Sequence, residues 1–261
     1  MKIISSKAYT IAAFALLLLM LLSFRTKPLD LLDREKNRSL NLQSTDVGIL
    51  RQEAFADISD NDRTRIQILE AQLSEMESGS EKIELLKELS STWYSIGELG
   101  IAGGYAEEVA VLEESAEAWG IAGTTFGLCV RQTDKDKERS FCLNKALESL
   151  ENAISLDPDE LAHQINRAVL LAENPPSDQP MRGVQLLLEM NKKFPKNVSV
   201  INNIAKFALQ TNQLERAEQR LLGALSLEPD NISTNCLLAQ LYNRIGDEVK
   251  ASAYEEVCRN R

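Results

Sequence analysis

One set of intervals recurs along the C-terminal half of this 261-residue chain. Pro158, Pro195 and Pro229 are separated by 37 and then 34 residues. Three further columns keep the same register: Leu150, Leu187 and Leu221; Ala168, Ala205 and Ala239; and Ala146, Gly183 and Ala217. The shared excess of three residues falls in the proline-containing segment 174–180, which we expect to be a loop. Four columns in one register indicate a single supersecondary unit that is stacked several times.

The residues between the columns have the spacing of amphipathic helices. Leu147, Leu150 and Ile154 lie at positions i, i+3 and i+7, which places them on one helix face. Each proline of the repeat ends a helix, because proline cannot continue one and disfavours helical backbone in its predecessor. Asn197 and Asn231 each follow such a proline by two residues, a position suited to capping the next helix. We therefore expect an all-α fold.

The repeat resembles the tetratricopeptide repeat (TPR), a helix–turn–helix unit of 34 residues. The best unit is 198–231, and the next best are 161–197 and 232–261. Degenerate units cover about 80–113 and 116–158. In 198–231 the apolar, small and proline positions of the family signature are occupied by Ile201, Ile204, Ala205, Ala208, Ala217, Leu221, Ala224 and Pro229.

The unit 116–158 is longer than the others. Its first helix carries Trp119-x2-Ala122-Gly123-x2-Phe126, close to the first-helix signature of the family. From Trp119 to Pro158 the chain has 11 residues more than the family spacing, and we assign them to a polar loop at 132–138. The resemblance implies a TPR-type α-solenoid of helical hairpins over 59–261. Helices are also expected over 60–77 and near 47–55.

An apolar segment precedes the repeats. Residues 8–24 carry no charge and lie between Lys7 and Arg25. As a helix this segment spans about 26 Å, short but sufficient for a bilayer core when the flanking cations reach the interfaces. We expect a single transmembrane anchor after a short tail at 1–7, followed by a polar connector at 25–58. The alternatives are a cleaved signal peptide, although no small-x-small cleavage site follows the segment, and a buried soluble helix.

Charge is distributed unevenly between the two parts of the chain. The whole chain carries a net charge of −10, yet residues 1–29 contain four basic side chains and no acidic one. The acidic body argues against nucleic-acid binding, which needs clustered basic charge. The layout is similar to that of bacterial membrane-anchored TPR proteins. We expect a single-pass protein of the bacterial inner membrane with its repeats in the periplasm, although basic residues on both flanks leave the orientation open.

Three features were considered as sites of chemistry. The segment Gly97-x2-Gly100-x2-Gly103-Gly104 lies between helical patterns, whereas a dinucleotide loop follows a strand, so we favour close helix packing or a turn. His163 is the only histidine and has no Cys or His at ligand spacing. The four cysteines either pair within hairpins (129 with 142, 236 with 258) or are small buried apolar residues, and we favour the latter. We expect no cofactor, no metal and no enzymatic activity.

The resemblance implies that first helices of the repeats line a groove for a peptide or partner protein. By alignment the groove-facing residues are Ser199, Asn202, Lys206, Gln210, Ser233, Gln240, Asn243 and Arg244, with Thr124, Ala162, Ile165 and Val169 upstream. At the end of the stack we expect Tyr254, Val257 and Cys258 to stand partly open and to mediate self-association.

Together these expectations describe a membrane-tethered scaffold or envelope assembly factor. The alternative is a periplasmic chaperone-like subunit that holds unfolded clients, and the remote alternative is an enzyme.

Overall fold

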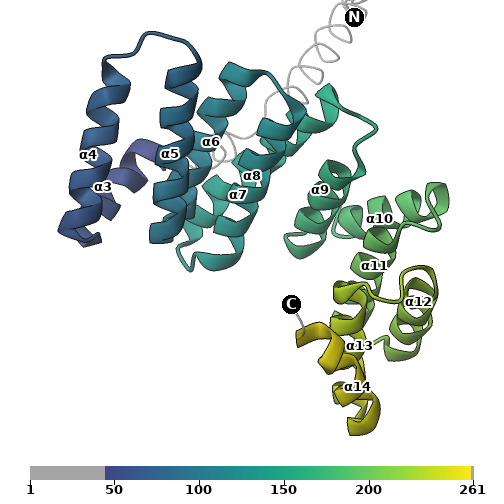
Figure 1. Cartoon of the computed structure of the whole chain (residues 1–261). Helices are drawn as coiled ribbons and strands as arrows, with labels where there is room; N and C mark the ends of the chain where they lie inside the picture. The colour runs from purple at the N-terminus through teal and green to yellow at the C-terminus, as the bar shows by residue number, and fades with distance from the viewer. Residues whose placement is uncertain (1–44, 260–261) are drawn as a thin grey trace, which may run out of the picture. The chain divides into compact units, whose positions relative to one another are not determined.

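The computed structural model describes residues 45–259, which form twelve α-helices and no strand (Figure 1). The all-helical prediction is confirmed for this part of the chain. The helices are α3 (Val47–Asp57), α4 (Asp60–Ser74), α5 (Ser80–Ile96), α6 (Leu99–Glu113), α7 (Ala116–Gln132), α8 (Asp136–Leu156), α9 (Leu161–Glu173), α10 (Arg182–Lys193), α11 (Val198–Gln210), α12 (Leu214–Leu227), α13 (Ile232–Ile245) and α14 (Glu248–Arg259). The expected tail, the anchor at 8–24 and the connector up to residue 44 lie outside the described residues. Between residues 45 and 259, no helix has the length and apolar character needed to cross a bilayer.

The helices from α5 onward pair as consecutive hairpins. Each expected repeat unit corresponds to one pair: α5 with α6, α7 with α8, α9 with α10, α11 with α12, and α13 with α14. The first helices also pack on one another, because α7 contacts α9, α9 contacts α11, and α11 contacts α13. A row of adjacent first helices is therefore a physical feature of this chain.

The repeat columns mark the ends and crossings of these helices. Asn197 Oδ1 accepts a hydrogen bond from the backbone N–H of Val200 at 3.0 Å, and Asn231 Oδ1 accepts one from Thr234 at the same distance. Both asparagines thus cap a first helix, as the sequence predicted. A methyl group added to Gly183 would lie 2.2 Å from the backbone nitrogen of Ala172, so the small-residue column permits close contact between the two helices of a hairpin.

The extra residues of the unit 116–158 are helical, which corrects the expected polar loop at 132–138. α7 ends at Gln132 and α8 begins at Asp136, so the connection has three residues, as in the α11–α12 hairpin. The helices themselves are longer, with 17 and 21 residues against 13 and 14 in α11 and α12. A polar composition was misleading here because the outer face of a long helix is polar too.

The glycine-rich segment packs α6 against its neighbours, as we favoured from the sequence. A methyl group on Gly104 would lie 2.5 Å from Val47, and one on Gly100 would lie 2.9 Å from Leu50. Both partners belong to α3, so the helical unit begins at residue 47, within the segment expected to be a connector. Tyr105 reinforces the contact by donating a 2.8 Å hydrogen bond to Glu70, which also pairs with Arg51 of α3.

The four cysteines form two disulfides, so the favoured interpretation as four buried thiols is wrong. Cys129 is bonded to Cys142 and Cys236 to Cys258, with Cα atoms 6.0 and 5.0 Å apart. Each pair joins the two antiparallel helices of one hairpin, where facing positions bring the Cβ atoms together. Spacing along the sequence identified the right pairs but did not decide their oxidation.

Two contacts join the helices of the last hairpin, α13 and α14. The ring of Tyr254 stacks on Tyr242 of α13 with centroids 5.6 Å apart, and Cys258 is held in its disulfide. Tyr254 and Cys258 are half-buried, in keeping with the partly open end that we expected, and their role in self-association stays a prediction. Of the three expected self-association residues, only Val257 is exposed.

Candidate partner-binding grooves

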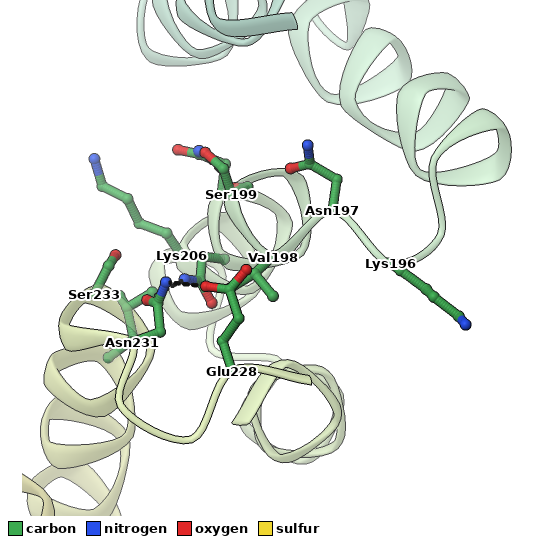
Figure 2. Close-up of a pocket in the computed structure, with 11 residues that line it drawn as sticks. Lys196, Asn197, Val198, Ser199, Lys206, Glu228, Asn231 and Ser233 are labelled. Atoms are coloured by element: carbon green, nitrogen blue, oxygen red, sulfur yellow. Dashed lines mark hydrogen bonds between the residues drawn. The ribbon is translucent and has the colours of Figure 1, made fainter. Parts of the chain in front are cut away.

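A cavity of 460 Å³ lies between α11 and α13, and we call it the polar groove (Figure 2). Its walls come from both first helices and from the turn that precedes each of them. The lining residues are Lys196, Asn197, Val198, Ser199, Asn202, Asn203, Lys206, Glu228, Asn231, Ser233 and Leu237. Most of these side chains offer hydrogen-bond donors or acceptors. The groove is therefore suited to a polar segment rather than to an apolar one.

A buried hydrogen-bond network fixes the distance between the two walls. Asn202 Nδ2 donates to Thr234 Oγ1 at 2.9 Å, and Thr234 Oγ1 donates to Asn231 Oδ1 at 3.0 Å. Thr234 is 0% exposed and Asn202 5%, so neither group can exchange this partner for water. Because buried polar groups must be hydrogen-bonded, the network holds α11 and α13 in register.

Lys206 at one end of the polar groove forms an ion pair with the preceding hairpin. Lys206 Nζ lies 3.0 Å from Glu173 Oε1 of α9, and Arg131 Nε of α7 lies 2.8 Å from Glu173 Oε2. Burial alone would raise the pKa of Glu173, but the hydrogen bonds from Lys206 and Arg131 outweigh it and lower that pKa. One carboxylate thus links three successive first helices.

The other two charged residues of the polar groove are Glu228, which is hydrogen-bonded to the wall, and Lys196, which is exposed. Glu228 accepts a 2.7 Å hydrogen bond from Asn231, as Figure 2 shows, and so lies against the wall. Lys196 is exposed and extends away from this cluster in Figure 2. The groove therefore presents one outward cation, one cation shared with Glu173, and one carboxylate held by the wall.

The structure brings together four of the eight expected groove residues. Ser199, Asn202, Lys206 and Ser233 line the polar groove, although Asn202 is buried in the wall. The other four are exposed and lie outside it: Gln210, Gln240, Asn243 and Arg244.

Two of these four have partners elsewhere. Asn243 donates to Glu255 of α14 at 2.8 Å, so it faces its own second helix. Arg244 donates to the backbone oxygen of Leu209 at 2.7 Å and ties α13 to the end of α11. Hydrogen bonding to neighbouring helices thus occupies both side chains away from the polar groove.

A second cavity, of 600 Å³, lies between α5, α6 and α7, and we call it the apolar groove. Tyr94 and Ile121 border it and are 50% and 54% exposed, which is high for large apolar side chains. The lining residues are Lys87, Ser90, Ser91, Tyr94, Ala106, Val109, Glu113, Glu117, Ala118, Ile121 and Thr125.

Sequence reasoning did not single out the apolar groove, although a signal was available. Tyr94 directly follows Trp93, and Ile121 directly precedes Ala122, and both of these neighbours are completely buried. Adjacent residues on a helix point about 100° apart, so an apolar residue beside a core position is a candidate for the helix surface.

A third cavity, of 410 Å³, lies between α7 and α9. Thr124 and Ala162 line it as the alignment implied, whereas Ile165 and Val169 are buried in the core. His163 also borders this cavity, and a methyl group on Gly120 would lie 2.3 Å from its ring. The histidine thus fills the space left by a glycine on the neighbouring first helix.

Comparison with known proteins gives likeness of fold only. No protein-family model and no curated protein matches the chain. Among solved structures it is similar to TTC0263, a thermophilic TPR protein of Thermus thermophilus, at 16% identity over 67% of this chain and 88% of that one (TM-score 0.49). It is also similar to PilF of Pseudomonas aeruginosa, at 19% identity over 68% and 75% (TM-score 0.45).

A third similar structure is PilW, described as a widely conserved type IV pilus biogenesis factor. The identity is 16%, over 70% of this chain and 78% of that one, with a TM-score of 0.46. At these values the likeness carries no information on function. The TPR resemblance rests on the repeat columns and the helical hairpins of this chain itself.

Proposed function

We propose that residues 47–259 form a protein-binding scaffold of the TPR type that holds an extended segment of a partner against its first helices. The observation that carries the proposal is a row of three cavities along the first helices: one between α5, α6 and α7, one between α7 and α9, and one between α11 and α13. A ligand that followed this row would meet apolar side chains first and polar ones later. Such a graded surface suits a partner with an apolar stretch followed by a polar or acidic one.

The second part of the proposal concerns location. Residues 8–24 tether the scaffold to a membrane, and the repeats lie on its oxidising side. Two disulfides within hairpins support this placement, because disulfides persist in the periplasm or outside the cell and are rare in a reducing cytoplasm. A scaffold in this position would act in the assembly of envelope proteins.

Site-specific photocrosslinking in native membranes tests the binding surface. A photoreactive residue is placed at Ser199 in the polar groove, at Tyr94 in the apolar groove, or at Gln219. Gln219 is an exposed residue of the second helix α12 and serves as the matched control. We expect the same partner in the adducts of Ser199 and Tyr94 and none at Gln219. Equal labelling at all three positions would refute a groove-bound partner.

The location has its own test. Protease added to spheroplasts should degrade the repeats without lysis if they lie outside the cytoplasm. Protection of the repeats until lysis would overturn the proposed orientation and leave the groove proposal standing.

The exposed Tyr94 and Ile121 also favour a second candidate, a holding chaperone for unfolded clients. A chaperone of this kind should suppress the aggregation of a model unfolded protein, and Tyr94→Glu should weaken that activity. A scaffold with a defined partner should show no such suppression.

A further inference from the structure

Glu138 lies beside a sulfur pair in the hairpin formed by α7 and α8. Its Oε1 is 3.7 Å from the Sγ of Cys129, and the two cysteines are 2% and 0% exposed. One candidate ligand atom from each of Cys129, Glu138 and Cys142 lies within 4.8 Å of the other two. Within residues 45–259 this is the one trio of His, Cys, Asp or Glu side chains that meets such a distance.

The carboxylate of Glu138 is held in place from its other side. Thr133 Oγ1 donates to Oε2 at 2.9 Å, which leaves Oε1 directed at the sulfur atoms. Among residues 45–259, no Lys, Arg or His forms an ion pair with this half-buried carboxylate, and the nearby Lys135 is paired with Glu53. A partly buried carboxylate without a cation beside it is available as a metal ligand.

We propose that Cys129, Cys142 and Glu138 form a zinc site when the Cys129–Cys142 disulfide is reduced. Two thiolates and one carboxylate are ligands that Zn²⁺ accepts, and three protein ligands leave one tetrahedral position for water. Tetrahedral geometry with Zn–S bonds of about 2.3 Å places the two sulfurs about 3.8 Å apart. The Cα atoms are 6.0 Å apart, and we expect rotation of the two cysteine side chains to bring the sulfurs to this separation.

The chemistry balances in two steps. A dithiol reductant gives two electrons and two protons to the disulfide, which yields two thiols while the reductant becomes a disulfide. Zn²⁺ then replaces the two thiol protons, and the zinc ion with two thiolates and one carboxylate carries a net charge of −1. The hairpin is cross-linked in both states, by a covalent bond when oxidised and by the metal when reduced.

The second cysteine pair is a built-in control. Cys236 and Cys258 join α13 to α14 in the same manner, but within the described residues no metal-ligating trio includes them. The proposal therefore predicts that reduction creates metal affinity at the first pair alone. It depends on neither the binding partner nor the membrane anchor.

The test uses the full chain in detergent micelles, reduced with a dithiol, freed of reductant without oxygen, and titrated with Zn²⁺ or Co²⁺. We expect the reduced chain to bind one metal ion and, with Co²⁺, to show a near-ultraviolet thiolate-to-cobalt charge-transfer band. The oxidised chain should bind no metal ion and show no such band. Zn²⁺ should also protect Cys129 and Cys142 from alkylation, as mapped by mass spectrometry.

Four variants make the test specific. Cys142→Ser should abolish the charge-transfer band or strongly weaken it, and Glu138→Gln should weaken Zn²⁺ binding. Thr133→Val should lower affinity by roughly 10- to 100-fold through loss of the group that orients Glu138. The double variant Cys236→Ser/Cys258→Ser should bind like the parent chain.

The proposal is overturned if the reduced parent chain binds no Zn²⁺, if binding persists undiminished in Cys142→Ser, or if binding disappears in the double variant. Should Cys142→Ser lose its helical circular dichroism, Glu138→Gln decides, because it changes one atom and leaves both cysteines. Unchanged affinity in Glu138→Gln would exclude the carboxylate ligand.

Discussion

Lys206 of α11 donates a 3.0 Å hydrogen bond to Glu173 of α9, across the boundary between two repeats. Glu173 also accepts from Arg131 of α7, so its carboxylate lies at the junction of three first helices. Its own side chain is 18% exposed, whereas those of Lys206 and Arg131 are 41% and 43% exposed. The acid is withdrawn from water and its two partners are not, which makes the junction sensitive to the charge of Glu173.

We predict that Glu173→Gln lowers the free energy of unfolding by roughly 0.5–1 kcal/mol at pH 7, because both partners are well hydrated. The pKa of Glu173 is lowered in the folded protein, so its ionised form stabilises the fold at pH values above the ordinary carboxyl pKa. That contribution is lost as the pH falls through the folded pKa. Urea titrations between pH 7 and pH 3 should therefore show the parent chain and the variant converging at low pH. A constant difference would contradict the charge argument.

Thr234→Val should destabilise the C-terminal hairpins more than its small size suggests. Valine has the shape of threonine but lacks the hydroxyl, so the buried Asn202 Oδ1 loses its 3.1 Å donor, whereas Asn231 Oδ1 keeps the backbone N–H of Thr234. Leaving such groups unsatisfied costs about 1–3 kcal/mol. The neighbouring Ser233→Ala, on the exposed side of the same helix, should stay within about 0.5 kcal/mol of the parent chain. Equal effects in chemical denaturation would show that the network contributes nothing.

Gly104→Leu should detach α3 from the rest of the helical unit. The first carbon of the new side chain would already lie 2.5 Å from Val47, so α3 must move or strain must accumulate. Overpacking of this kind costs about 1–3 kcal/mol. Tryptic cleavage after Arg51 should become faster. Gly223→Ala is the control, because nothing lies within 4 Å of its added methyl group, and it should stabilise α12 by roughly 0.5–1 kcal/mol.

The predictable parts of this fold depend on local backbone and packing rules. The prolines and the capping residues Asn197 and Asn231 mark helix boundaries because their effects are confined to the chain around them. The alanine and glycine columns marked helix crossings because only a small side chain lets two helix backbones come close, as at Gly183.

The parts that were missed depend on what surrounds a residue. Alignment places Asn202 at a groove-facing position, yet its side chain is buried because it donates a hydrogen bond to Thr234 of the next repeat. The position of Ile121 beside Ala122 makes it a candidate for the helix surface, but its 54% exposure depends on which side chains the neighbouring helices place beside it. Whether the cysteines are oxidised depends on the redox conditions of the compartment, which the repeat pattern of the sequence does not reveal.

Removal of the Cys236–Cys258 disulfide should loosen α14 selectively. The bond closes a separation of 22 residues, for which chain entropy gives a stabilisation of about 3 kcal/mol. The full amount should not appear in global unfolding, because α14 makes its extensive contacts with α13 alone and can open by itself. In Cys236→Ala/Cys258→Ala we therefore expect faster amide hydrogen exchange across residues 248–259 and a nearly unchanged urea midpoint for α5 to α10.

Cys129→Ala/Cys142→Ala should instead affect the middle of the helical unit, because α7 and α8 contact neighbours on both sides. Protection of α14 at parental levels would mean that the stacking of Tyr254 on Tyr242 is sufficient to hold the last helix.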